Sequence, residues 1–241
     1  MIRFDLRGKN TMELRQIATI YNDYTDKFGI PRQSGLADTE SRIVFEKTYR
    51  NADALRGMEG FSHLWLIWGF SEVPQEDAFR PTVRPPRLGG NTRVGVWATR
   101  SPYRPNPLGL SCVKIIRVET ATQDGPVITV SGADLMNGTP IYDIKPYIPY
   151  ADCMSGAAGG FADEFAGYRL EVVWAPGVRE KALAEGRSEE WLDGLAGVLS
   201  TDPRPAYQAD PAKVYGMRYA DAEVSFSAEE TRLIIRDVRG T

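Results

Sequence analysis

The sequence predicts a mainly β protein in which a β-barrel catalytic domain is followed by a small C-terminal α+β domain. Short apolar and β-branched runs, separated by turn residues, recur as far as Tyr150 with almost no helical periodicity. A run of small residues at 152–162 then interrupts the chain. Beyond it, strand-like and helix-like patterns alternate. We therefore expect two domains, over residues 12–155 and 162–241.

The strands of the barrel are predicted from apolar runs bounded by turn signals. The run His63–Phe70 is nearly all apolar or aromatic, which is typical of a strand buried on both faces. Asp124-Gly125 and Asn137-Gly138 are tight-turn signals. Residues 1–11 are polar and mixed, and we expect a loose leader there. We expect strands at 14–21, 42–45, 63–70, 94–98, 110–118, 127–131 and 139–144, a rigid loop at 28–35 and one helical turn at 51–57.

The C-terminal domain is predicted from a change of periodicity. Its helical region has leucines at positions that can share one apolar face. A proline-framed arginine, Arg204, lies between that region and the last strands. The predicted elements are a strand at 170–174, a helical region at 178–199 interrupted at Gly186 with Leu183, Leu192, Leu195 and Leu199 on its apolar face, and a terminal strand pair at 223–227 and 232–238.

Composition excludes several classes of protein. Apolar residues make up 42% and charged residues 25%, as in ordinary globular domains, and a net charge of −3 argues against general nucleic-acid binding. Cys112 and Cys153 have no disulfide-framework spacing and no segment is apolar enough to cross a membrane, so we expect a cytoplasmic protein with reduced thiols. His63 is the only histidine, which disfavours a zinc site or a Ser-His-Asp triad. Phosphate-loop and dinucleotide-binding glycine motifs are missing.

The most distinctive stretch of the chain is an arginine block over residues 80–111. It contains six arginines, six prolines and four glycines, and no Asp or Glu occurs from Ala78 to Val118. Prolines stiffen the backbone, so the arginines lie on rigid loops around a short strand. Arginines in fixed geometry suit a phosphate or carboxylate ligand, although a solvated loop with scattered ion pairs would have the same composition. Trp97 and Tyr103 within the block could stack on a base or fill core, and of the two we expect them to fill core.

Four groups of motifs, taken in order, resemble the TrmO family, also called TsaA-like proteins. The resemblance spans roughly residues 14–150, and the segment Asp202-Pro-Arg-Pro-Ala-Tyr207 matches the long bacterial form. A match in several parts has a far lower chance rate than one short motif. The motifs are Pro31-Arg-Gln33; Gly60-Phe-Ser-His-Leu-Trp65; Arg84-Pro-Pro-Arg-Leu-Gly-Gly-Asn91 with Ala98–Ser111; and Asp134-Leu-Met-Asn-Gly-Thr-Pro140 with Asp143-Ile-Lys-Pro-Tyr147.

This resemblance implies an S-adenosylmethionine-dependent methyltransferase that acts on threonylcarbamoyladenosine beside the tRNA anticodon. It also implies a β-barrel unrelated to Rossmann-like methyltransferases, a homodimer and no metal. Non-catalytic S-adenosylmethionine-responsive or RNA-binding proteins, and methylation of another acceptor, are the alternatives. The resemblance places the cofactor contacts at Pro31, Arg32, Gln33, His63, Leu64, Arg100, Leu110, Asp134 and Leu135.

Methyl transfer to a ureido-type nitrogen requires alignment of the acceptor with the methyl group and a group that takes its proton. His63, Asp134 and Asp143 are the candidates for that catalytic role, and the residues alone do not choose between them. Arg100 suits the cofactor carboxylate or a tRNA phosphate, or a structural ion pair. Candidate tRNA-binding residues, which suit phosphates or the threonyl carboxylate, are Arg84, Arg87, Arg104, Lys145 and Arg204.

Two departures from the family pattern affect particular loops. Asn137 stands where bacterial members usually have aspartate, which removes an acidic role but keeps the Asn-Gly turn. Tyr21-Asn-Asp-Tyr24 replaces the usual Ser-Pro-Tyr after the first strand, so that loop is expected to differ in shape. Neither departure touches the arginine block.

Overall fold

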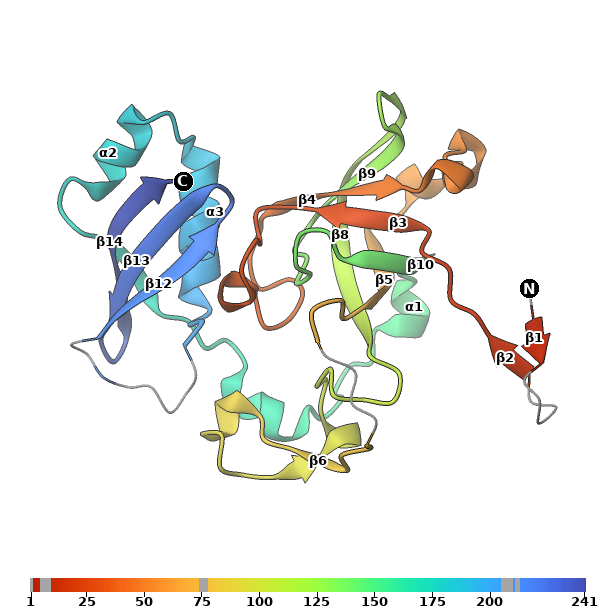
Figure 1. The fold of residues 1–241 in the computed structure, drawn as a ribbon, viewed down its shortest axis with the longest axis horizontal. Coiled ribbons are helices and arrows are strands. Elements are labelled where there is room, and N and C mark those ends of the chain that lie inside the picture. The colour runs from red at the N-terminus through yellow and green to blue at the C-terminus, as the bar shows by residue number, and fades with distance from the viewer. Residues whose placement is uncertain (1, 5–9, 74–77, 205–209, 211–212) are drawn as a thin grey trace.

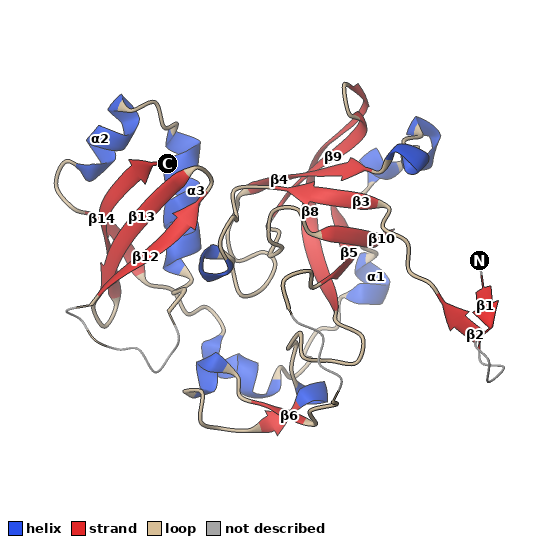
Figure 2. Ribbon diagram, viewed as in Figure 1, coloured by secondary structure: helices blue, strands red, loops and turns tan. Residues whose placement is uncertain are grey.

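The computed structural model describes residues 2–4, 10–73, 78–204, 210 and 213–241. A β-barrel and a separate C-terminal sheet with two helices lie side by side, and part of the arginine block projects beyond both (Figure 1). Strands dominate both parts (Figure 2). The mainly β class with a C-terminal α+β domain is therefore confirmed.

The barrel is closed and has six antiparallel strands. Strands β3 and β4 pair with each other, as do β8 and β9, and β10 pairs with both β3 and β5 and so completes the ring. Closure leaves no free sheet edge in the barrel. In the order of their pairing the strands are β10 (Pro140–Pro146), β3 (Ala18–Tyr21), β4 (Glu40–Phe45), β9 (Gly125–Ser131), β8 (Leu108–Thr122) and β5 (His63–Gly69).

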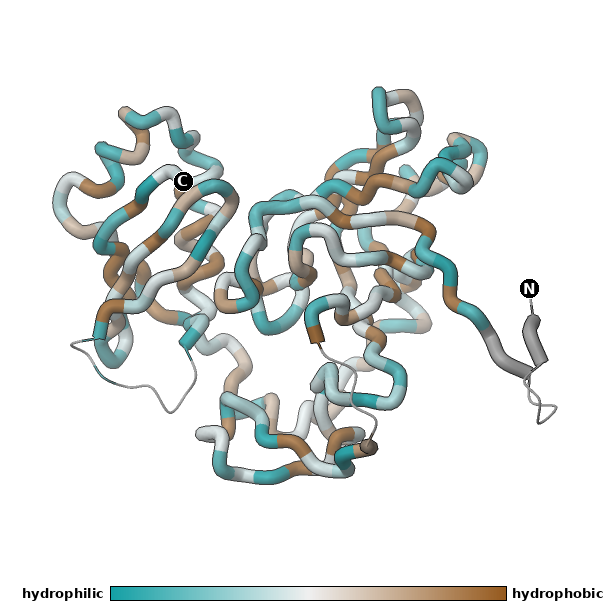
Figure 3. The backbone as a smooth tube through the Cα atoms, viewed as in Figure 1, coloured by the Kyte–Doolittle hydropathy of each residue, from teal (hydrophilic) through white to brown (hydrophobic). Residues whose placement is uncertain are grey.

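Strand β5 is buried on one face, which corrects the expectation of burial on both. Leu64, Leu66 and Trp68 point into the barrel and are buried, whereas His63 and Trp65 alternate with them and are half-buried on the outer wall. Figure 3 shows hydrophobic positions recurring along the barrel strands. The apolar outer residues include aromatic rings, which suit a half-exposed surface because their polar tips can reach partners. Trp65 Nε1, for example, donates to Asp152 at 3.0 Å.

The C-terminal domain is a four-stranded sheet with helices packed on it. Strand β11 (Glu171–Trp174) runs parallel to β14 (Arg232–Gly240), which pairs antiparallel with β13 (Ala222–Ala228), and β13 pairs with β12 (Val214–Tyr219). The predicted terminal pair is thus confirmed, and β12 was missed. Helix α2 (Val178–Ala184) and helix α3 (Glu189–Ser200) confirm the predicted helical region with its interruption at Gly186.

The break between these two helices follows from local chemistry. Gly186 has a φ of 93°, a left-handed conformation that favours glycine and ends a helix. The Ser188 hydroxyl accepts from the Trp191 backbone N–H at 3.2 Å and caps α3. Leu192, Leu195 and Leu199 are buried against the sheet as predicted, whereas Leu183 is only half-buried.

Several local predictions are wrong in detail. The predicted strand at 94–98 is strand β7 (Val94–Gly95), paired with β6 (Thr82–Val83), and the chain then turns into a 3-10 helix at Val96–Ala98. The N-terminal residues that were expected to form a loose leader include a short strand pair, β1 (Ile2–Phe4) with β2 (Asn10–Met12).

The remaining short elements connect the sheets. The first barrel strand, predicted at 14–21, is shorter than predicted: residues 14–17 are not part of a strand, and β3 begins at Ala18. Helix α1 (Pro149–Asp152) and a 3-10 helix at Gly160–Phe165 flank the small-residue break. The other 3-10 helices are Lys27–Gly29, Lys47–Tyr49, Ala52–Leu55, Met58–Gly60 and Pro86–Leu88.

The loop after β3 joins the barrel to the C-terminal sheet. Tyr24 and Phe28 pack in the core of the C-terminal domain, where Phe28 stacks on Tyr215 and Phe226. The Asp23 carbonyl accepts from the Ala220 backbone N–H at 2.7 Å. This loop leads directly into Pro31-Arg32-Gln33, so the C-terminal domain helps to position that motif.

Candidate active site

A cavity of about 530 Å³ opens at one end of the barrel, a size typical of small-molecule sites. Four stretches far apart in the sequence meet there: the loop after β3, the end of β5 with the residues that follow, the arginine block, and the segment after β9. The lining residues are Lys27, Ile30, Pro31, Arg32, Gln33, Trp68, Phe70, Ser71, Glu72, Val73, Arg100, Arg104, Leu108, Gly109, Leu110, Asp134, Met136 and Thr139.

Asp134 supplies a carboxylate to this cavity. The Trp68 indole N–H donates to the Ser111 hydroxyl oxygen at 2.9 Å, and the Ser111 hydroxyl is hydrogen-bonded to Asp134 Oδ1 at 2.5 Å. Because an indole can only donate, the Ser111 proton must point towards Asp134, and the carboxylate is held by a directional chain. Burial raises the pKa of the Asp134 carboxyl, while the Ser111 hydrogen bond and the Arg100 charge lower it.

Arg100 and Gln33 bridge two of the motifs. Arg100 Nη1 donates to the Gln33 side-chain oxygen, and both residues line the cavity. The Arg100 side chain is otherwise exposed, so its remaining donors can receive an anion that enters the cavity. The contact joins the arginine block to the Pro31-Arg32-Gln33 loop at the site where Asp134 also lies.

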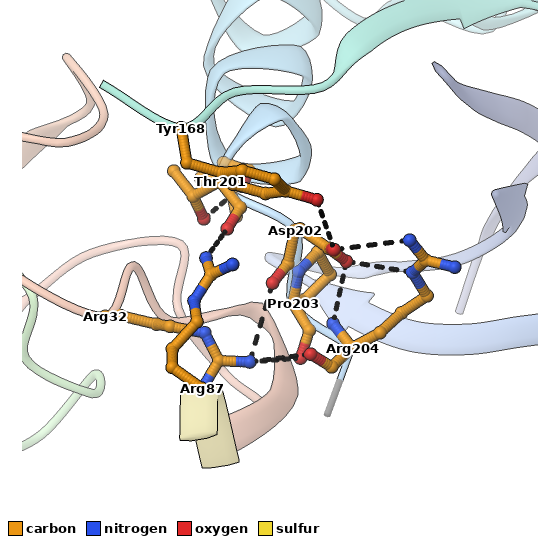
Figure 4. Close-up of polar contacts among 8 residues, drawn as sticks. Arg32, Arg87, Tyr168, Thr201, Asp202, Pro203 and Arg204 are labelled. Atoms are coloured by element: carbon orange, nitrogen blue, oxygen red, sulfur yellow. Dashed lines mark hydrogen bonds and ion pairs between the residues drawn. The ribbon is translucent and has the colours of Figure 1, made fainter. Parts of the chain in front are cut away.

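Arg32 lines the cavity but also connects it to the C-terminal domain. Its Nη2 donates to the carbonyls of Pro203 and Arg204 at 3.2 and 2.8 Å, and more weakly to that of Asp202 at 3.5 Å (Figure 4). Burial, followed by the like charge of Arg87, lowers the pKa of its guanidinium. Arg32 Nε is buried, and among the described residues no acceptor reaches it.

Arg87 and Arg204 are held in the same cluster rather than on open surface. Arg87 donates to the Thr201 carbonyl at 2.7 Å and stacks over the Tyr168 ring, with 4.8 Å between its Cζ and the ring centroid. Arg204 forms an ion pair with Asp202 at 2.8 Å, and both side chains are 10% exposed. The Tyr168 hydroxyl donates to the other Asp202 oxygen at 3.2 Å (Figure 4). Pro205, Ala206 and Tyr207 of this motif lie outside the described residues.

Arg104 is also used within the chain. Its Nη2 donates to the carbonyls of Val96 and Thr99 at 3.1 and 2.9 Å, and its guanidinium lies over the Trp97 ring. Of the arginines and lysines predicted to bind tRNA, Arg84 and Lys145 are exposed. Lys145 forms an ion pair with Asp143 at 3.0 Å on β10.

Four of the predicted catalytic and cofactor-binding residues lie away from the cavity. His63 is at the opposite end of β5 from the cavity, on the outer wall, where its Nδ1 is 2.8 Å from the Ser62 hydroxyl. Leu64 and Leu135 are fully buried in the barrel core. Asp143 is on β10, where its carboxylate accepts from the neighbouring Ile144 N–H. These four residues therefore do not meet Asp134 at this cavity, and their predicted roles at the site stay predictions.

The cavity also contains residues that the motifs did not single out. Trp68, Phe70, Ser71 and Glu72 come from the far end of β5, and Lys27 donates to the Glu72 carbonyl at 2.6 Å across the cavity. A signal for them existed in the sequence, because polar Ser71-Glu72 directly follows a long apolar strand. Side chains at strand ends often form sites on a rigid scaffold.

Two further kinds of site, a metal centre and a membrane-spanning helix, are absent from the described residues. Within the described ranges, no group of three His, Cys, Asp or Glu side chains is arranged to hold a metal ion. No helix in the described part of the chain has the length and apolar character needed to cross a bilayer.

Together the fold and the cavity define a β-barrel protein with a site of small-molecule size, lined by a carboxylate, Asp134, and an arginine, Arg100. Residues 19–153 match the family model of the tRNA-methyltransferase O N-terminal domain, and residues 167–241 match that of the TrmO C-terminal domain. The chain belongs to the TrmO family of tRNA methyltransferases, as the motifs had indicated.

Individual relatives agree with this assignment over most of their length. The tRNA (adenine(37)-N6)-methyltransferase of Escherichia coli is 39% identical over 221 residues, 89% of this chain and 92% of its own. That of Eikenella corrodens is 44% identical over 74% of this chain and 97% of its own. A crystal structure of TrmO from Pseudomonas aeruginosa superposes with a TM-score of 0.76, at 31% identity, over 96% of this chain and 98% of that one. Other relatives are named for S-adenosylmethionine dependence or binding.

Proposed function

We propose that this protein transfers the methyl group of S-adenosylmethionine to N6 of threonylcarbamoyladenosine at position 37, beside the anticodon of tRNA. The relatives' names support methylation of that adenine nitrogen. The observation that carries the proposal is a cavity lined by a partly buried carboxylate, Asp134, and by Arg100, which suits a cofactor that is both a cation and a carboxylate. Threonylcarbamoyladenosine as the acceptor is what the family resemblance implies.

The lining of the cavity fits the cofactor. S-adenosylmethionine, when bound, supplies an electrophilic methyl group on a sulfonium. Trp68, Phe70 and Leu110 provide apolar surface for an adenine ring, and Arg100 provides a donor for the amino acid carboxylate. Asp134 and Glu72 bring negative charge to a cavity that would receive a cation. Pro31 and Gln33 form the adjoining wall, so six of the predicted cofactor contacts, Pro31, Arg32, Gln33, Arg100, Leu110 and Asp134, line the cavity.

Asp134 is the proposed proton acceptor. Of the three candidates for this role, it is the one that lines the cavity, whereas His63 and Asp143 lie on the outer wall of the barrel. Burial raises the pKa of its carboxyl, which makes the ionised form a stronger base. The Trp68–Ser111 chain fixes one oxygen of this carboxylate at the cavity.

The predicted tRNA contacts divide into two kinds. We propose that the exposed Arg84 and Lys145 meet phosphates directly. Arg87, Arg104 and Arg204 already donate to carbonyl or carboxylate oxygens of the chain, and their proposed role is to shape the loops around the cavity. Their charge still adds to the local positive potential that attracts RNA.

The decisive experiment combines cofactor binding with product analysis. Calorimetry should detect S-adenosylmethionine binding, and mass spectrometry of tRNA nucleosides should detect methylated threonylcarbamoyladenosine after incubation. Unmodified transcript tRNA is the control, and it should remain unmethylated. Methylation of the transcript would favour another acceptor, and cofactor binding without any methylated nucleoside would favour the non-catalytic alternative.

We extend the proposal to assembly and location. Domain limits at 12–155 and 162–241 are supported by the gap between the two family models. A homodimer is implied by the family resemblance, and the exposed apolar side chains of Phe61, Ile116 and Met154 offer surface for it. Light scattering would test the dimer. A tRNA substrate implies a cytoplasmic enzyme, which cell fractionation would check.

A further inference from the structure

An exposed aromatic pair joins Trp97 of the arginine block to Phe79, the residue directly before the block. The rings of Phe79 and Trp97 are stacked, with centroids 5.7 Å apart and planes at 22°. Their side chains are 54% and 66% exposed, which corrects the expectation that Trp97 fills core. Tyr103, predicted to be buried as well, is 49% exposed. Large exposed rings side by side are unusual on a surface that binds nothing.

The backbone holds this pair in place. Strands β6 and β7 pair through Val83 and Val94, and the Val96 N–H donates to the Pro81 carbonyl at 2.9 Å, which brings the chain of Phe79 alongside that of Trp97. Arg104 lies over the Trp97 ring at 5.3 Å and donates to the carbonyls on either side of it. The rings are therefore pre-organised, so little conformational entropy would be lost when a ligand stacks on them.

The arginine block beside the pair carries charge of one sign, although Glu76 and Asp77 precede Phe79 in the sequence. Arg84 directly follows Val83 and Arg93 directly precedes Val94, so both exposed arginines lie together at the end of the short ladder that is farther from Phe79 and Trp97. The surrounding sequence from Ala78 to Val118 contains no Asp or Glu. A second copy of this face would bring arginines against arginines, which is unfavourable, whereas a polyanion would be attracted.

The pair also lies beside the active-site cavity. Arg104 contacts Trp97 and lines the cavity, and Arg100, three residues after Trp97, lines it too. A nucleic acid whose adenosine enters the cavity would therefore place its neighbouring nucleotides over the arginine block. Unpaired bases are recognised by stacking on aromatic side chains, while arginines hold the backbone.

We propose that the Phe79–Trp97 pair is a stacking platform for an unpaired anticodon-loop base next to the adenosine that is methylated, with Arg84 and Arg93, at the other end of the short ladder, on phosphates farther along the RNA. This inference rests on the proposed function, because it takes tRNA as the substrate. The proposed role of Phe79 and Trp97 is in RNA binding and not in cofactor binding, since neither residue lines the cavity.

The test measures binding of an RNA hairpin with the anticodon-loop sequence to the full-length protein. Trp97→Ala should weaken the hairpin's Kd by about 5- to 150-fold, because loss of one base–aromatic stack has an effect of that order. Trp97→Phe should retain most of the affinity. Tyr21→Ala, which removes a 47% exposed ring from the barrel wall, is the matched control and should leave binding unchanged. Arg84→Ala and Arg93→Ala should each reduce the salt dependence of binding by about one unit of slope.

Each outcome separates this inference from the proposed function. Calorimetric S-adenosylmethionine binding should be the same in Trp97→Ala as in wild type, which shows that the variant is folded. Wild-type methylation with unchanged hairpin affinity in Trp97→Ala would overturn the platform alone. A change of oligomeric state in that variant, with unchanged RNA affinity, would assign the face to contacts between copies. A wild-type protein that neither binds the hairpin nor methylates tRNA would remove the proposed function itself.

Discussion

The two ends of strand β5 differ sharply in what they offer chemically. At one end, His63 lies on the outer wall beside the Tyr147 ring and the Ser62 hydroxyl. The Asp143–Lys145 ion pair of β10 lies on the same outer wall, opposite Ile67 and Trp65 in the middle of β5. At the other end, the Trp68 indole is the first donor in the chain that holds Asp134, and Phe70 and Glu72 line the cavity. The second end therefore faces the cavity, and His63 at the first end does not line it.

This difference shows that the role of a titratable side chain in a family motif depends on its place in the barrel as well as on its residue type. Side chains alternate between the two faces of a strand, and a barrel has two ends, so a motif can place its polar residue in any of four environments. Asp134 is partly buried, accepts from the Ser111 hydroxyl and lies near the charge of Arg100. Asp143 has an exposed lysine and its neighbouring backbone N–H.

The strongest test of this contrast replaces the carboxylate at each place. Asp134→Asn should lower kcat by about 100-fold or more, because removal of a positioned general base typically has that effect. Asp143→Asn is the matched control on the outer wall and should change kcat by less than about threefold. Both are measured by single-turnover methylation of modified tRNA. Equal losses in the two variants would show that the outer wall belongs to the active site.

Arg100 should have the next largest effect, on the cofactor rather than on the chemical step. Arg100→Ala should raise the Kd of S-adenosylmethionine by about 10- to 100-fold and abolish methylation at ordinary cofactor concentration, since a charge-assisted hydrogen bond is lost. Arg100→Lys should recover part of the affinity, because it keeps the charge but not the planar donors. Calorimetry checks both variants. An unchanged Kd for Arg100→Ala would make the Gln33 contact purely structural.

Ser111 offers a test through pH. The Ser111 hydrogen bond lowers the pKa of Asp134, and burial raises it, so Ser111→Ala should raise that pKa further. If Asp134 must be ionised to accept the proton, activity is lost as pH falls through its pKa. The acidic limb of the pH profile of kcat should therefore move to higher pH in Ser111→Ala. A limb at the wild-type pH would argue that Asp134 binds the cofactor without taking a proton.

The loops at the cavity end are also held by contacts with the segment that leads to the C-terminal domain and with the end of helix α3, and Arg87 makes two of these contacts. Arg87→Ala loses a hydrogen bond to the Thr201 carbonyl and a stacking contact with Tyr168, so the free energy of unfolding should fall by about 1.5–3 kcal/mol. Lys145→Ala, on the outer wall, removes an exposed ion pair and should change it by less than about 1 kcal/mol. Chemical denaturation measures both. Similar values would mean that the cluster of Figure 4 contributes little to stability.

The sequence predicted the barrel because its signals are local. Alternating apolar residues and the Asn137-Gly138 turn, where Gly138 has a φ of 82°, act within a few residues of one another. The strand predicted at 94–98 failed because Val-Gly-Val favours extension, whereas burial of Val96 and the hydrogen bond from Thr99 to its carbonyl favour a 3-10 turn.

The division of the arginines could not be predicted for a different reason. Arg32 and Arg87 donate to carbonyls more than 100 residues away, at Asp202–Arg204 and Thr201. Which carbonyls are left without a backbone partner depends on how the chain leaves helix α3 towards the C-terminal strands, and composition carries no trace of that. The motif resemblance located the cavity through Pro31-Arg32-Gln33 and Asp134, but it could not separate the two ends of β5.

The smallest expected effect is at His63. Because its imidazole lies on the outer wall, close to the Ser62 hydroxyl and the Tyr147 ring, His63→Ala should change kcat/KM by no more than about two- to threefold. The same single-turnover assay used for Asp134 applies. A loss of tenfold or more would have a specific meaning, since the residue is too far along β5 to reach the cavity of its own chain. It would imply that a second copy completes the site with its outer wall, and the homodimer would then be part of the catalytic unit.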